Sequence, residues 1–180
     1  MVVIKDPDGP SLRITEDGHA LTTSTIITEI EHASEESLSA YSWSSGTFDP
    51  GVNDTILLVQ NNSITDLHIV SVACSTYVDT IVTIHRPNVT FAIASATQIT
   101  GVNLNSNGTN ILSTDTTVVD ARQNETGNAI GDIFWRGEIS TASGTYTRFM
   151  PGVILGRGKS IAVDYLADTG VVGVTIIGHF

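Results

Sequence analysis

The sequence predicts an all-β protein: an antiparallel β-sandwich of the jelly-roll type with an extended arm at its N-terminus. Three apolar runs follow one another at Thr55–Gln60, Leu67–Cys74 and Thr80–His85, and polar residues separate them. Short strands joined by polar turns, with no room for crossover helices, are typical of a sandwich or barrel. The length of 180 residues suggests one domain, and roughly eight to ten strands fit it, which is the range of a jelly roll.

The chain is expected to divide near residue 45. Residues 1–45 combine Pro, Gly and Asp turns with short β-prone pieces, and Glu29–Leu38 is the one plausible helix. That helix would offer only Ile30, Ala33 and Leu38 as an apolar face, which leaves it little to bury. We therefore expect residues 1–45 to form an arm that becomes ordered on another surface, and residues 46–180 to form the sandwich.

Further strands are expected along the rest of the chain, with polar loops such as Asn105–Asn110 between them. The candidate segments are Val89–Ala94, Gln98–Leu104, Thr116–Arg122, Ile130–Ile139, Thr145–Phe149 and Pro151–Leu155. In Ile56–Val59 apolar residues occupy both faces, which indicates a central strand or a subunit contact.

The end of the chain has the clearest alternation of apolar and polar residues. Ile161, Val163 and Tyr165 share one face of a predicted strand. Residues 172–180 alternate in the same way, with Val172, Val174, Ile176 and Phe180 on one face. We expect these two strands to form a hairpin that closes a sheet.

The charge of the chain argues against several kinds of partner. The formal net charge is -11, with 8 Lys and Arg residues against 19 Asp and Glu residues. Nucleic-acid binding needs clustered basic residues, so we expect none. No apolar run approaches the roughly 20 residues of a membrane-spanning helix, and Met1–Lys5 lacks the features of a signal peptide. The acidity favours solubility, with a basic docking partner as the alternative.

The motifs that could carry chemistry are weak. Cys74, the only cysteine, lies in a strand-like run, where a buried inert thiol is the usual outcome. Gly156–Ser160 looks like the end of a phosphate-binding loop, but a strand follows it where that loop needs a helix. A metal site at Glu29–Glu36 would need ligands from a second helix. We therefore expect no catalytic residues, metal or cofactor, and a protein that is not an enzyme.

Contacts with partners are expected to involve five apolar and aromatic residues. They are Ile26, Ile30, Tyr41, Trp43 and Trp135. A sugar-stacking platform is the alternative for the aromatic residues Trp43, Phe48, Trp135 and Tyr146, although anchors in the core or at an interface are favoured.

Several segments resemble the virion proteins of tailed phages. They are residues 1–9, 26–36, 40–47, 54–62, 67–69, 158–165 and 174–178. The resemblance covers about half of the chain and does not extend to residues 88–150.

What the resemblance implies is a structural component of a phage particle, on the head surface, of the decoration or cement type. Such a protein assembles in the host cytoplasm and resides in the virion. Its partners would be the major capsid protein or other virion proteins, and further copies of itself, with a trimer favoured. The alternative is a receptor- or carbohydrate-binding head of a fibre or turret.

Overall fold

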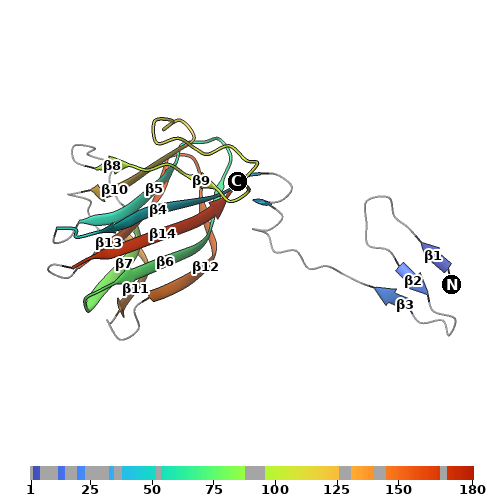
Figure 1. Ribbon diagram of the computed structural model, residues 1–180, viewed down its shortest axis with the longest axis horizontal. Helices are drawn as coiled ribbons and strands as arrows, with labels where there is room; N and C mark the ends of the chain where they lie inside the picture. The colour runs from blue at the N-terminus through green and yellow to red at the C-terminus, as the bar shows by residue number, and fades with distance from the viewer. Residues whose placement is uncertain are drawn as a thin grey trace.

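Three antiparallel sheets make up the computed structural model (Figure 1). It describes residues 2–4, 12–14, 20–22, 33–34, 38–51, 54–87, 96–125, 131–139, 145–166 and 170–180. The first sheet is a small one near the N-terminus, in the order β1-β2-β3. Its strands are β1 (Val2–Ile4), β2 (Leu12–Ile14) and β3 (Ala20–Thr22).

The other two sheets form the sandwich. The six-stranded sheet runs in the order β11-β7-β13-β5-β10-β8, and the five-stranded sheet in the order β12-β6-β14-β4-β9. The six strands are β5 (Thr55–Asn61), β7 (Thr80–Arg86), β8 (Thr97–Gln98), β10 (Val119–Glu125), β11 (Asp132–Ile139) and β13 (Lys159–Tyr165). The five strands are β4 (Ala40–Phe48), β6 (Leu67–Thr76), β9 (Val102–Asn103), β12 (Thr145–Leu155) and β14 (Val172–His179).

The order of the strands is that of a jelly roll. Apart from the short strands β8–β10, β4, β6, β12 and β14 lie in one sheet, and β5, β7, β11 and β13 lie in the other. Consecutive strands switch sheets except at β7 and β11, which are neighbours in the same sheet. In the five-stranded sheet β4 lies next to β14, and in the six-stranded sheet β5 lies next to β13. Such pairing of strands that are far apart in the sequence is typical of Greek keys. The predicted all-β sandwich is therefore confirmed.

The core lies between the two sheets and contains the residues that alternate inward along each strand. Ile161, Val163 and Tyr165 of β13 are fully buried in it, as the alternation predicted. From the facing sheet Trp43 and Ile176 are also fully buried. Burying side chains of this size stabilises the fold by about 1.5–3 kcal/mol each.

Strand β5 occupies a central position, which is one of the two alternatives that its apolar residues on both faces indicated. It pairs with β13 on one side and β10 on the other. Leu57 and Val59 belong to the core, while Leu58 points to the outer face of the sheet and is also fully buried. A strand that is covered on both faces needs apolar residues in succession, which explains its unbroken Ile-Leu-Leu-Val sequence.

The predicted boundary near residue 45 falls inside a strand of the sandwich. β4 begins at Ala40 and pairs with β14 from Ala40 to Phe48. Ala40 and Trp43 are both fully buried. The sandwich therefore begins at Ala40, because its first strand is needed to complete the five-stranded sheet.

Two other details of the prediction were wrong. The last two strands do not form a hairpin, because β13 pairs with β5 and β7 whereas β14 pairs with β4 and β6 in the other sheet. The segment Gln98–Leu104 does not form one strand either. It contributes β8 to one sheet and β9 to the other, and so crosses the edge of the sandwich.

Three further predictions concern the strands at 145–155, the helix at Glu29–Leu38 and the strand at Val89–Ala94. The segments predicted at 145–149 and 151–155 form one strand, β12, whose register shifts between Phe149 and Val153. Of the predicted helix, Ala33 and Ser34 are helical. The predicted strand at Val89–Ala94 lies outside the described residues.

Candidate interaction face

The two sheets of the sandwich differ sharply in charge. Strands β4, β6, β9 and β14 contain no Asp, Glu, Lys or Arg, and β12 contains only Arg148. The strands of the six-stranded sheet carry Arg86, Asp120, Arg122, Glu125, Asp132, Arg136, Glu138, Lys159 and Asp164. The five-stranded sheet is therefore almost free of charge in a chain with a net charge of -11.

The strand register identifies the side chains on the outer face of the five-stranded sheet. Residues opposite each other in an antiparallel pair share a face, and the face alternates along each strand. Because Ile176 is in the core, its neighbours Thr175 and Ile177 point outward. Ile177 lies opposite Ser42 of β4, which in turn lies opposite Val102 of β9.

We call this surface the uncharged face. Its described residues are Ser42, Ser44, His68, Ser71, Ala73, Ser75, Val102, Leu104, Ile154, Thr175, Ile177 and His179. Half of them are the small residues Ser, Ala and Thr, which lie mainly on the central strands. Three apolar side chains are well exposed at its two edges: Val102 (52%) and Leu104 (42%) at the β9 edge, and Ile154 (50%) at the β12 edge.

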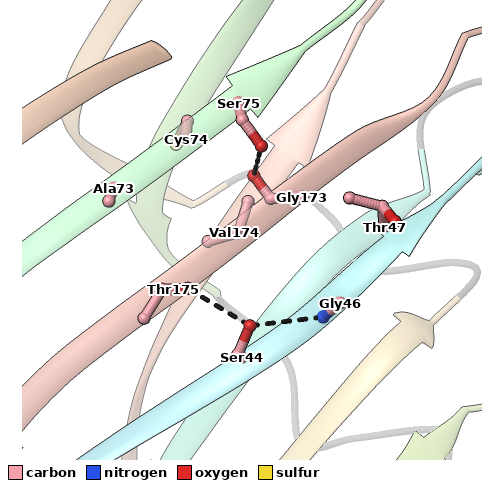
Figure 2. Close-up of a pocket in the computed structure, with 9 residues that line it drawn as sticks. All are labelled: Ser44, Gly46, Thr47, Ala73, Cys74, Ser75, Gly173, Val174 and Thr175. Carbon is pink, nitrogen blue, oxygen red and sulfur yellow. Dashed lines mark hydrogen bonds between the residues drawn. The ribbon is translucent and has the colours of Figure 1, made fainter.

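A shallow hollow lies in this face where a β-bulge interrupts the pairing of β4 with β14 (Figure 2). Its volume is about 270 Å³. Two residues of β4, Ser45 and Gly46, lie opposite the single residue Val174 of β14, which makes a β-bulge. Gly46 has a φ of 66°, a conformation that side chains with a Cβ atom rarely adopt. The bulge and the absent side chain at Gly173 leave the hollow open.

The hydroxyl groups around the hollow are engaged with one another and with the backbone. Thr175 Oγ1 donates to Ser44 Oγ (3.2 Å), which also accepts from the Gly46 amide (3.3 Å). Ser75 Oγ donates to the Gly173 carbonyl at 3.4 Å (Figure 2). A hollow this small, with its hydroxyl groups turned along the sheet, is better suited to receive a neighbouring surface than to enclose a ligand.

Two histidines stack on the same face. His68 of β6 and His179 of β14 are directly opposite each other. Their ring centroids are 5.1 Å apart, with an angle of 22° between the planes. His179 is buried and His68 is half-buried. The pair fills the end of the face between Leu104 and Ile154.

The outer face of the six-stranded sheet contrasts with this, because it holds buried polar pairs. Asp164 accepts hydrogen bonds from Thr55 Oγ1 (2.8 Å) and from His85 Nε2 (2.7 Å). Arg122 donates to Asp120 through both Nε and a terminal nitrogen, each at 2.7 Å. All five side chains are at most 9% exposed, so they are closed to a substrate. Thr55, Asp164 and His85 link β5, β13 and β7, whereas Asp120 and Arg122 pair within β10.

The free thiol is equally inaccessible. Cys74 is buried in the core, and burial raises the pKa of its thiol from 9.0 to about 12. The thiolate is the reactive form of cysteine, so this side chain is inert at neutral pH. Among the described residues no cluster of three His, Cys, Asp or Glu side chains could hold a metal ion.

The structure separates the residues that were expected to make contacts. Trp43 is fully buried in the core, with Tyr41 beside it at 5.9 Å between ring centroids. Trp135 lies on β11, in the other sheet, and is partly buried against the core. Ile26 and Ile30 lie outside the described residues.

The proposed sugar-stacking platform is not assembled by the fold. Trp43 and Phe48 belong to β4, whereas Trp135 belongs to β11 in the opposite sheet. Trp43 offers no exposed surface on which a sugar could stack. The side chain of Tyr146 lies outside the described residues.

The loop at residues 103–110 makes hydrogen bonds to the segment that precedes β4. Asn103 Nδ2 donates to the Leu38 carbonyl (2.6 Å), and Asn105 Nδ2 donates to the Ser34 carbonyl (2.9 Å). The amide of Leu104 donates to the Ala40 carbonyl (2.9 Å). These asparagines therefore fix the chain just before β4, which is a structural role for a loop that could otherwise have bound a ligand.

Sequence reasoning missed the uncharged face, although its signal was present. The absence of charged residues from β4, β6, β9 and β14 can be read directly from the sequence. These strands form one surface only because the fold places them side by side.

Comparison of the chain with protein-family models, curated proteins and solved structures found no match. Within the described residues no helix is long and apolar enough to cross a membrane.

Proposed function

We propose that this chain is a structural protein of a tailed-virus particle, which decorates or cements the capsid surface. In this proposal the N-terminal residues attach the protein to the major capsid protein or another virion protein. The jelly roll forms the exposed body and associates with further copies of itself, with a trimer favoured. The resemblance of residues 1–9, 26–36 and 40–47 to phage virion proteins supports this assignment.

One structural observation carries the proposal. The described strands before Ala40 form a sheet of their own and add no strand to either sheet of the sandwich. The eight strands of the jelly roll all lie at or after Ala40. The N-terminal part is therefore available to contact another protein while the sandwich keeps its fold.

Deletion of residues 1–32 tests the attachment. The deletion spares Ser34, Leu38 and Ala40, which the asparagine loop holds, and it keeps β4 whole. We expect the shortened chain to keep the thermal stability of the full chain and to lose at least about tenfold of its affinity for virus heads stripped of accessory proteins. Co-sedimentation with these heads measures the affinity.

The control is deletion of residues 1–45, which removes Trp43 from the core. This chain should fail to fold, so its loss of binding would say nothing about attachment. If the chain without residues 1–32 binds stripped heads as tightly as the full chain, the attachment role of the N-terminal part is excluded.

A receptor- or carbohydrate-binding head is the second candidate, and Trp135 carries it. Trp135 lies on the edge strand β11, and its ring lies so close to Gly137 that a Cβ atom there would be 2.3 Å from Trp135 Cζ2. The ring packs against the core but is only partly buried, so its uncovered side is the part on which a sugar would stack. Glycan-array binding that is lost in Trp135→Ala and retained in Trp135→Phe would support this function; absence of binding to any glycan would argue against it.

A further inference from the structure

The uncharged face is unusual for a surface in contact with water. Sheets that face solvent normally carry charged side chains, and free edges are protected by Lys, Pro or short strands. Here the outer face of β4, β6, β9 and β14 has no such charge. At one edge Val102 and Leu104 are exposed, and at the other Ile154 is exposed. The face is therefore free of charge across these four strands and carries exposed apolar side chains at both edges.

The charge distribution indicates which partner covers this face. Nucleic acid would require basic residues, and a partner recognised by its charge would require complementary charges. The face supplies neither. Two copies of a chain with a net charge of -11 repel each other, so they can meet closely only where neither carries acidic residues. The uncharged face meets that condition, whereas the six-stranded sheet exposes Asp132 and Glu138.

The shape of the face agrees with the same partner. Sheets pack face to face at about 10 Å when their side chains interdigitate. Ser42, Ala73 and Thr175 are small and leave a flat surface, and the hollow at Gly46 and Gly173 gives a depression of about 270 Å³ for a side chain from the other copy. In a contact about a two-fold axis the same patch serves both subunits.

We propose that a second copy of this chain packs against the uncharged face. This contact rests on the self-association in the proposed function and assigns it to named residues, as a two-fold pair in place of the favoured trimer. Val102, Ile154 and Ile177 become buried in the contact, and Thr175 lies near its centre.

The test introduces a charge at the centre of the face of the full chain. Thr175→Glu places one carboxylate from each copy in the contact. The matched control is Thr97→Glu, the same change at an exposed position of β8 in the other sheet. Sedimentation equilibrium and light scattering measure the mass of each protein across a range of concentrations, and thermal melts check that each variant is folded.

We expect the unmodified chain to associate, and to do so more strongly as salt rises from about 0.05 M to about 0.5 M, because salt screens the repulsion between acidic copies. Thr175→Glu should weaken association more than about tenfold, because like charges are forced together in the contact. Thr97→Glu should leave it unchanged. Val102→Glu, at the edge of the face, gives a second variant if Thr175→Glu does not fold.

Two results would overturn the assignment. The first is a chain that stays monomeric at every concentration and salt level. The second is association that Thr175→Glu and Val102→Glu leave as strong as Thr97→Glu does. Because no virus particle is present, these results are independent of the test of attachment to virus heads. A chain that associates but does not bind heads would retain this contact and reject the capsid role.

Discussion

His85 Nε2 and Asp164 Oδ2 lie 2.7 Å apart, although the two residues are 79 positions apart in the sequence. The second ring nitrogen of His85, Nδ1, accepts a hydrogen bond from the amide of Gly131 at 3.2 Å. Since Nδ1 is an acceptor, the proton of the neutral ring is on Nε2, which donates to Asp164. Thr55 donates to the other carboxylate oxygen at 2.8 Å. This group of side chains links β5, β13 and β7 across the outer face of the six-stranded sheet.

Replacement of Asp164 by Ala should destabilise the sandwich by about 3 kcal/mol, because the buried donors of Thr55 and His85 would lose their acceptor. Asp164→Asn should cost less, since the amide oxygen still accepts one of the two hydrogen bonds. Urea unfolding measures both free energies. Asp66→Ala, at an exposed position, should stay within about 0.5 kcal/mol of the unmodified chain. An Asp164→Ala protein as stable as this control would contradict the structural role of the pair.

The pair Asp120–Arg122 should respond differently to single and double replacement. Arg122→Met leaves the buried Asp120 carboxylate without its two hydrogen bonds and should cost about 3 kcal/mol. Adding Asp120→Leu should restore much of that loss, because no uncompensated charge remains buried. Urea unfolding of the two single variants and the double variant measures the coupling between them.

The control for that cycle is the exposed ion pair of Arg86 with Asp132, whose nearest nitrogen and oxygen are 3.8 Å apart. Arg86→Met should cost below about 1 kcal/mol, because exposed ion pairs contribute little. Equal losses for Arg122→Met and Arg86→Met would show that burial adds nothing to the first pair.

Cys74 makes the stability of the fold depend on alkaline pH. Its folded pKa of about 12 is above its ordinary value of 9.0, so the folded state holds the proton more tightly than the unfolded state. This contribution to stability is complete below pH 9.0 and is lost as the pH rises toward 12. Cys74→Ala should therefore reduce the decline of the unfolding free energy over that range.

Thiol reactivity provides a direct measurement of the same burial. In the folded protein Cys74 should react with a disulfide reagent at pH 8 at least about a hundredfold more slowly than in urea, since little thiolate is present and the sulfur is covered. The double variant Cys74→Ala, Thr97→Cys, whose thiol is exposed, should react quickly in both states. Rapid reaction of native Cys74 would contradict its position in the core.

Gly101 is required by its close approach to Trp43. A Cβ atom at Gly101 would be 2.5 Å from Trp43 Nε1, and the indole is held in the core with no exposed surface. Gly101→Ala should therefore cost about 1–3 kcal/mol through overpacking. Gly156→Ala is the control, because its nearest neighbour, Asp66 Oδ1, would be at an ordinary 3.6 Å. Thermal melts compare the two variants, and an equal melting temperature would contradict the packing of Gly101 on Trp43.

Much of the local structure could be predicted because alternation and turn chemistry are local properties. β5, β6 and β7 begin at Thr55, Leu67 and Thr80, where their apolar runs begin. β4 was missed because its sequence, Ala-Tyr-Ser-Trp-Ser-Ser-Gly-Thr-Phe, has few apolar residues and contains glycine. It is a strand because β14 and β9 pair with it and because the core surrounds Trp43.

The predicted interaction residues differ from the observed surface for a related reason. Trp43 and Trp135 were predicted to contact partners because they are large aromatic residues, but aromatic residues pack in a core as well as in an interface. Only the fold decides that Trp43 is buried and that Thr175 and Val102 lie outside. A single small polar residue such as Ser44 does not indicate a contact, since such residues are also typical of loops; only the absence of charge from whole strands does.

The sequence by itself determined the all-β class and the inward face of β13, because hydrophobic burial follows a period of two along each strand. For β5 it left two alternatives, a central strand or a subunit contact. The tertiary structure alone decided which strands are neighbours, since backbone hydrogen bonds are the same for every strand and do not select a partner. It placed β14 between β4 and β6, and in doing so it gathered the strands without charge into one face. It also brought His85 to Asp164, where both side chains are buried and loss of their hydrogen bond would lower the stability of the fold.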